Sequence, residues 1–173
     1  MKQLPAMAVL LSLLSVLGCS DSVPNPISPQ EGRNQVVEVS RQVVTDLGAE
    51  VADAKFGYQS CNDQGEAPFR AHSYLLLWMP GADRSREVSA ESVLDRLRQR
   101  GWQTDPDFTS HSTTFKRDGV DVSVSVIPPH RPNEPPKAHV IAEVFGECRD
   151  TFDHQSDKTD RLSQDIRNEL GVG

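Results

Sequence analysis

A β-hairpin is the element that this sequence specifies most firmly. Two runs rich in strand-forming residues, 112–117 and 120–126, flank the pair Asp118-Gly119, which suits the tight turn of a hairpin. In the second run every even-numbered residue is Val, and the odd-numbered residues are Asp or Ser. Because side chains alternate across a strand, we expect the four valines to face a core and Ser123 to face water. The chain must therefore build an antiparallel sheet with one buried face.

Two helices are predicted before this hairpin. Residues 35–47 carry Val and Leu at spacings of three and four, and Gly48 follows at a position that favours helix termination. A second helix is expected to begin after Ser89, which can cap its N-terminus, and to close at Gly101. Each helix has one apolar face that must pack against the sheet.

Shorter apolar runs predict further strands at residues 55–58, 74–79 and 138–148. The proline-rich stretch 128–136 cannot pair in a sheet and is predicted to be an exposed loop. The order of elements predicts an α+β fold, with an antiparallel sheet of about four strands, helices packed on one face and one disulfide.

The N-terminus has the pattern of a secretory leader. Lys2 precedes an apolar stretch of about fifteen residues, which is shorter than the roughly twenty needed to span a membrane. The run Val16-Leu17-Gly18-Cys19 resembles the lipobox of bacterial lipoproteins. The resemblance implies that residues 1–18 are a signal peptide and that Cys19 receives a diacylglycerol and becomes the new N-terminus. The alternatives are an ordinary secretory leader and an N-terminal membrane helix.

A lipidated Cys19 predicts a protein held on the extracytoplasmic side of the cell membrane, with the membrane as its partner, because two or three acyl chains anchor stably. Ser20 follows it in place of Asp, which permits outer-membrane sorting in a Gram-negative cell. The excess of Arg over Lys points instead to a GC-rich genome such as that of an actinobacterium. The formal charge of −7 excludes a generally basic nucleic-acid binder.

The organisation predicted after the leader has three parts. Residues 19–34 contain three prolines among polar residues and form a lipidated flexible tether. Residues 35–150 form the α+β domain. Residues 151–173 form a charged tail in which Leu162, Ile166 and Leu170 would make at most one narrow helical stripe.

Cys61 and Cys148 are an even pair in an exported chain, which predicts a structural disulfide between them. A redox pair would need a CxxC motif, and a metal site would need companion ligands, and neither accompanies these cysteines in the sequence.

No catalytic or cofactor motif appears, so no catalytic residue, cofactor or metal site is predicted. The five histidines have no recognisable ligand spacing, at His72, His111, His130, His139 and His154. His72 and His139 lie near strand starts, where a solvated or hydrogen-bonded side chain is expected; the alternative is a metal site shared by the two. Acidic residues spaced by three and four predict a solvated helix face, at Asp150, Asp153, Asp157 and Asp160. Five arginines lie close together in the sequence and form a basic concentration, at Arg84, Arg86, Arg96, Arg98 and Arg100. They form either an ordinary solvated face or a surface that binds anionic lipid or an acidic partner.

Three short motifs combine with the leader and the order of elements to suggest a family. They are Gly57-Tyr58-Gln59-Ser60-Cys61, Gly101-Trp102 and Gly146-Glu147-Cys148. Over most of residues 19–150 the layout resembles the small uncharacterised lipoproteins of actinobacteria, including a mycobacterial LppA-like group. The resemblance implies location and fold, without catalytic residues. We therefore expect a non-enzymatic module of the cell envelope that binds an unknown envelope protein or ligand. The alternative is an envelope hydrolase or a lipid or glycan carrier whose site is assembled from distant residues.

Overall fold

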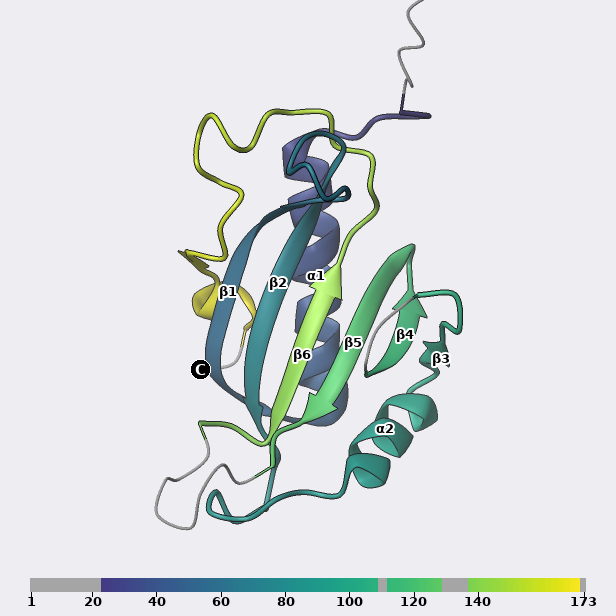
Figure 1. Ribbon diagram of the computed structural model, residues 1–173. Coiled ribbons are helices and arrows are strands. Elements are labelled where there is room, and N and C mark those ends of the chain that lie inside the picture. Colours follow the sequence, from purple (N-terminus) through teal and green to yellow (C-terminus); the bar gives the residue numbers. More distant parts are fainter. Residues whose placement is uncertain (1–22, 109–111, 129–136, 172–173) are drawn as a thin grey trace, which may run out of the picture.

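The computed structural model describes residues 23–108, 112–128 and 137–171, and the elements are drawn in Figure 1. The predicted signal peptide, Cys19, His111 and His130 lie outside the described residues. In chain order the elements are α1 (Pro29–Leu47), β1 (Glu50–Ser60), β2 (Phe69–Trp78), α2 (Ala90–Gln99), β3 (Gln103–Thr104), β4 (Thr113–Arg117), β5 (Val120–Val126), β6 (Val140–Phe145), β7 (Gln164–Asp165) and the 3₁₀ turn η1 (Arg167–Glu169).

The described strands form one antiparallel sheet in the order β3-β4-β5-β6-β2-β1-β7. The predicted antiparallel α+β fold is confirmed, but the count of about four strands is wrong. The described sheet has seven strands, because the two-residue strands β3 and β7 pair along its outer edges. Strands of that length carry no periodicity that a sequence pattern can reveal.

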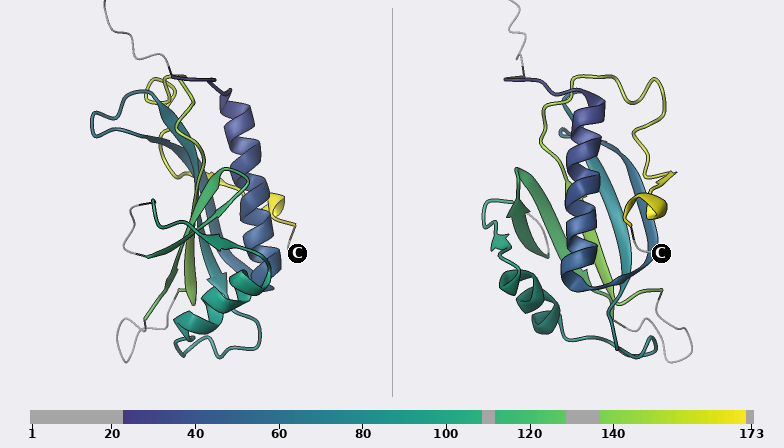
Figure 2. Two further views of the ribbon diagram at one scale, coloured as in Figure 1. Left: turned by 90° about the vertical axis from the view of Figure 1, so that its right-hand side faces the viewer. Right: turned by 180° about the vertical axis from the view of Figure 1, so that it is seen from behind.

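Both helices and η1 lie on the same side of the sheet (Figure 2). Helix α1 packs against β2, β6 and β5, and α2 packs beside α1 and β5. The apolar stripe of α1 is almost fully buried and consists of Val36, Val37, Val39, Val43, Val44 and Leu47. Valine is a mediocre helix former, so burial of this stripe against the sheet, rather than intrinsic propensity, stabilises α1.

Helix α1 begins six residues earlier than the sequence pattern indicates. Ser28 accepts a hydrogen bond from the backbone N–H of Glu31, the Glu31 carboxylate accepts one from the Ser28 backbone, and Pro29 occupies the first turn. This capping box defines the helix start. Residues 29–34 are therefore helical and do not belong to a flexible tether, so the predicted tether 19–34 is too long at its C-terminal end.

The predicted hairpin is confirmed in β4 and β5, where Phe115 pairs with Val122. Val120, Val122 and Val124 are buried on the helix-facing side. The expectation that Ser123 faces water is wrong, because only 4% of this residue is exposed. Its strand neighbours are Thr114 of β4 and Glu143 of β6, which flank it on both sides.

The disulfide prediction is confirmed: Cys61 is bonded to Cys148, with their Cα atoms 6.0 Å apart. The bond links the residue after β1 to the chain that leaves β6, across 87 residues of sequence.

Residues 149–171, called the C-terminal segment here, are an integral part of the fold rather than a solvated tail. Ile166 and Leu170 are buried, while Leu162 is exposed, so the predicted helical stripe does not exist. The segment instead crosses the β1 edge in an extended path and ends in η1 (Figure 1). Within the described part of the chain, no helix combines the length and the apolar character needed to cross a membrane.

Candidate functional site

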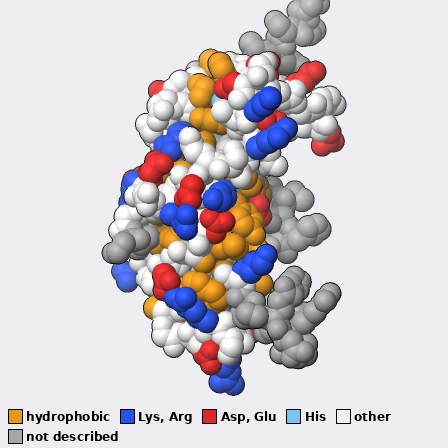
Figure 3. Space-filling model, turned by 90° about the vertical axis from the view of Figure 1, so that its left-hand side faces the viewer, with side chains coloured by type: hydrophobic (Ala, Val, Ile, Leu, Met, Phe, Trp, Pro, Cys, Tyr) orange, Lys and Arg blue, Asp and Glu red, His pale blue; other side chains and the backbone are white. Residues whose placement is uncertain are grey.

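A cavity of about 440 Å³ opens where the first turns of α1, the middle of β1 and the C-terminal segment meet. Pockets that hold small ligands have volumes of roughly 300–1,000 Å³. The lining mixes aromatic, cationic and polar side chains, and includes Arg33, Phe56, Tyr58, Phe152, His154, Asp157, Lys158, Thr159, Arg161 and Gln164. Figure 3 views the molecule from the side of β1 and shows exposed hydrophobic side chains among charged ones of both signs.

The C-terminal segment lies against β1 because the two backbones bond to each other. The Tyr58 N–H donates to the Thr159 carbonyl at 2.9 Å, and the Ile166 N–H donates to the Ala54 carbonyl at 3.2 Å. Between these bonds the approach is so close that a Cβ on Gly57 would stand 2.2 Å from the Arg161 carbonyl oxygen. Gly57 is therefore required by contact with the segment, which forms one wall of the cavity.

Arg33 of α1 holds the far end of the same segment. Its guanidinium donates to both carboxylate oxygens of Glu169, at 2.7 and 3.0 Å, and to the Gln164 side chain at 3.3 Å. The hydrogen bonds from Arg33 lower the pKa of Glu169 below its usual range, although burial opposes this shift. The same guanidinium lies 5.2 Å from the centre of the Phe56 ring.

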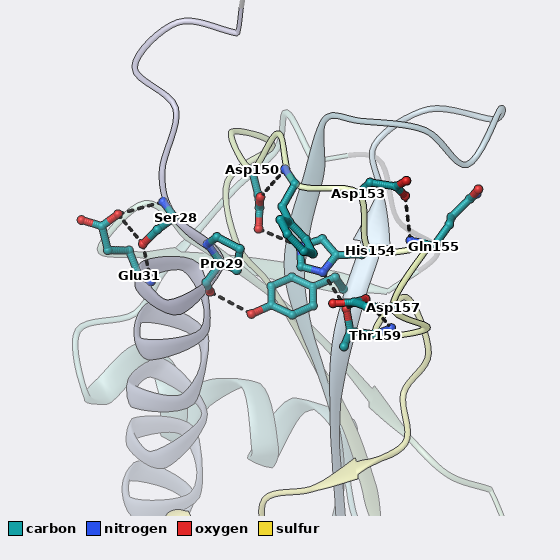
Figure 4. A network of polar contacts seen from close by, with 11 residues as sticks. Ser28, Pro29, Glu31, Asp150, Asp153, His154, Gln155, Asp157 and Thr159 are labelled. Atoms are coloured by element: carbon teal, nitrogen blue, oxygen red, sulfur yellow. Dashed lines mark hydrogen bonds and ion pairs between the residues drawn. The ribbon is translucent and has the colours of Figure 1, made fainter.

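The buried side chain of His154 is the centre of a polar network that borders the cavity (Figure 4). Its Nε2 lies 2.9 Å from Asp150 Oδ2, and its Nδ1 lies 2.6 Å from Thr159 Oγ1. The Thr159 hydroxyl in turn donates to Asp157 at 2.5 Å. The imidazole also stacks on the Tyr58 ring, with centroids 3.6 Å apart.

The order Asp150–His154–Thr159 resembles that of a catalytic triad. The Thr159 hydroxyl differs from a triad nucleophile in one contact, because it donates its single proton to the Asp157 carboxylate.

Tyr58 links the network to α1. Its hydroxyl donates to the Pro29 carbonyl at 2.8 Å. Burial raises the pKa of Tyr58 to about 12, and the negative charge of Asp150 acts in the same direction. The phenol is therefore neutral and serves as a hydrogen-bond donor between β1 and the helix.

The structure separates residues that the sequence grouped together. Of the four acidic residues assigned to one solvated helix face, Asp150 is buried and bonded to His154, while Asp153, Asp157 and Asp160 are exposed in turns. A helix face is therefore the wrong description, because residues 151–163 contain no helix.

The arginines of the basic concentration also make separate contacts. Arg84 pairs with Glu50, Arg96 donates to the Leu47 carbonyl at the end of α1, and Arg98 pairs with Asp95. Three of its five members thus have local partners of their own.

His139 is hydrogen-bonded, as the sequence analysis expected, whereas the buried Nε2 of His72 makes no hydrogen bond within the described part of the chain. His139 Nδ1 accepts from the Met79 N–H, so its Nε2 donates to the Asp83 carbonyl. His72 stacks on Phe145 and lies 3.4 Å from Glu143. No group of three or more candidate metal ligands occurs within residues 23–108, 112–128 and 137–171.

The cavity itself was not predicted. Arg33 lay in the assumed tether, and Lys158 and Arg161 lay in the assumed tail, so no pattern connected them to β1. One signal was available in the sequence: Gly57, next to a buried aromatic residue in a strand, indicates close approach of another backbone.

The fold and cavity define a disulfide-bonded α+β domain with a small ligand-sized pocket, and comparison with known proteins supplies the family. A family model described as "Putative lipoprotein LppJ" matches residues 28–169. The chain therefore belongs to the LppJ lipoprotein family, an actinobacterial group of the kind that the sequence resemblance implied.

Individual relatives agree with this family. Proteins described as "Putative lipoprotein LppJ" from two strains of Mycobacterium tuberculosis and from Mycobacterium bovis are 27% identical over 139 residues. The alignment covers 79% of this chain and 69% of each relative. No solved structure matches this chain significantly. Membership of a lipoprotein family indicates attachment to a membrane of the cell envelope.

Proposed function

We propose that this protein is a lipoprotein anchored through a diacylglycerol on Cys19, on the extracytoplasmic face of the cell membrane, where its domain acts as a non-enzymatic binding module. The observation that carries the proposal is the combination of LppJ family membership with the run Val16-Leu17-Gly18-Cys19. The cavity at the β1 edge supports a binding role, because it offers a concave surface with convergent polar groups.

An anchor at Cys19 would bring the cavity close to the membrane. Ile27 is bonded to the domain, since its N–H donates to the Arg149 carbonyl at 3.0 Å. Eight residue-to-residue steps lead from Cys19 to Ile27, and a chain of that length reaches at most about 28 Å. The end of the domain that carries Ile27, Pro29 and Asp150 would therefore stay near the lipid surface, and the cavity lies at that end.

The hydrogen bond from Thr159 to Asp157 favours a binding module over the hydrolase alternative. A general base must be able to take the proton of its nucleophile, and here the Thr159 hydroxyl donates to Asp157 instead. The network is better suited to holding the cavity wall in place.

The anchoring proposal is tested by labelling with a radioactive or clickable fatty acid in a bacterial host. We expect label in the wild-type protein and in Ser20→Ala, which changes the neighbouring residue and keeps the thiol. Cys19→Ser should take up no label, because no acceptor thiol remains. Label that persists in Cys19→Ser would refute the anchor. Protease treatment of intact spheroplasts tests the side of the membrane: the domain should be digested, and full protection would contradict an extracytoplasmic position.

A further inference from the structure

The charges around the cavity do not cancel. Arg33 is paired with Glu169, and Asp157, the one carboxylate among the lining residues, accepts a hydrogen bond from Thr159. Lys158 and Arg161 remain, and among the described residues neither side chain has a hydrogen-bond or ion-pair partner. Two unpaired cations therefore border a pocket in a chain whose formal charge is −7.

The same cavity exposes an aromatic surface. Phe152 is 49% exposed, and among the described residues Phe152 and Leu162 are the only large hydrophobic side chains with such exposure. Phe56 and Tyr58 of β1 also line the cavity, but both are buried, so Phe152 supplies the exposed aromatic side chain. Ligand pockets are typically lined by aromatic side chains together with a few convergent polar groups.

From this juxtaposition we infer that the cavity binds a small anion that carries an apolar group, with the anion at Lys158 and Arg161 and the apolar group against Phe152. A soluble aryl or alkyl phosphate has this chemistry, and so does the phosphate headgroup of an anionic lipid. The inference deepens the proposed binding function by naming the ligand class, and therefore rests on that proposal.

Other ligand classes fit the lining less well. A divalent cation would find one carboxylate among the lining residues, Asp157, which already accepts a hydrogen bond from Thr159. A neutral apolar ligand would leave Lys158 and Arg161 without a counterion. A bare inorganic anion would leave Phe152 exposed to water. An anion with an apolar group satisfies both sets of side chains at once.

The test uses the full-length acylated protein in nanodiscs of phosphatidylcholine, titrated by calorimetry with phenyl phosphate, inorganic phosphate and benzyl alcohol. We expect saturable binding of phenyl phosphate. Inorganic phosphate lacks the ring and benzyl alcohol lacks the charge, so each should bind about tenfold more weakly or worse. Equal affinities for phenyl phosphate and either single-feature probe, or no binding of phenyl phosphate, would overturn the inference.

Variants place the binding in this cavity. Lys158→Gln and Arg161→Gln should each weaken phenyl phosphate binding by about tenfold, since each removes one charge-assisted contact. Arg86→Gln is the matched control, because it removes an exposed cation in the loop before α2 and should leave the affinity unchanged. Equal affinities in all three variants would overturn the inference. All three positions are exposed, so the variants should fold, and their circular dichroism spectra verify this.

A second set of nanodiscs distinguishes the sources of the ligand. In phosphatidylglycerol nanodiscs, a lipid headgroup that occupies the cavity would weaken phenyl phosphate binding in the wild-type protein. Unchanged affinity would assign the site to a soluble anion, and both results retain the ligand chemistry. Failure of this inference is separable from failure of the anchor: absent binding by a protein that still acquires a fatty acid at Cys19 refutes the ligand class alone.

Discussion

The hairpin β4–β5 and the C-terminal segment both contribute to the fold, but they are stabilised in different ways. The hairpin has a regular ladder and a row of buried valines, with Phe115 opposite Val122. The C-terminal segment has little regular structure, and it depends on two buried side chains, Ile166 and Leu170, and on the contacts of Asp150, His154 and Arg33.

The difference shows how irregular chain can become part of a core. A regular strand satisfies its backbone groups through the ladder, so its side chains need only alternate. An extended segment without a long ladder must satisfy its polar groups individually, and a buried carboxylate such as Asp150 supplies acceptors for the Phe152 N–H and for His154. Few residues therefore hold the segment in place, and replacing any one of them should lower the free energy of unfolding substantially.

The disulfide should have the largest effect on stability, because it links the residue after β1 to the chain that leaves β6 just before the C-terminal segment. Replacing both Cys61 and Cys148 by Ala should lower the free energy of unfolding by about 4–5 kcal/mol, as expected for closure of a loop of about ninety residues. Urea denaturation monitored by circular dichroism measures the loss. The wild-type protein under reducing conditions is the control and should behave like the variant; unchanged stability in both would contradict the prediction.

Asp150→Ala should destabilise the protein by about 1–3 kcal/mol for each of two lost hydrogen bonds, because the buried imidazole of His154 and the Phe152 N–H both lose their partner. Asp160→Ala is the matched control, since this exposed residue makes no side-chain hydrogen bond within the described part of the chain, and its effect should stay within about 0.5 kcal/mol. Similar thermal stabilities of the two variants would show that the network does not hold the C-terminal segment.

Truncation of one buried aliphatic side chain in each region tests whether they unfold together. Ile166→Ala should cost about 2–5 kcal/mol and Val124→Ala about 1–3 kcal/mol, from lost transfer free energy and the remaining cavity. Native-state hydrogen exchange distinguishes cooperative from local opening. If Ile166→Ala reduces protection in residues 149–171 alone, the segment is an independent unit and the hairpin does not depend on it.

The titration of Tyr58 should give the smallest energetic effect and the most local one. The chain has two tyrosines, so Tyr74→Phe leaves Tyr58 as the only phenol, and its ultraviolet absorbance should report a pKa of about 12. Because the folded pKa lies above the unfolded value of about 10, the stabilising contribution of Tyr58 is complete below pH 10 and is lost as pH rises towards 12. Adding Asp150→Ala should lower the pKa of Tyr58, because that change removes a nearby negative charge and loosens the packing of His154 on the Tyr58 ring. A pKa near 10 in the folded protein would show that Tyr58 is open to water.

The sequence by itself determined the parts of this protein that depend on neighbours along the chain. The Asp118-Gly119 turn, the alternating valines and the capped helix after Ser89 follow from periodicities and turn preferences that act over a few residues, and the structure has each of them. The pairing of Cys61 with Cys148 was also predictable, because an exported chain with two remaining cysteines has one pairing available.

The tertiary structure alone decided what the residues outside these patterns do. Arg33, Tyr58 and His154 are distant in sequence, and they border one cavity because the C-terminal segment crosses β1 at Gly57. Of four similarly spaced acidic residues, only Asp150 is buried, since it alone lies where the chain leaves the sheet beside Phe69 and meets an imidazole. Such choices depend on contacts across more than a hundred residues, and spacing along the chain carries no information about which side chain finds a partner there.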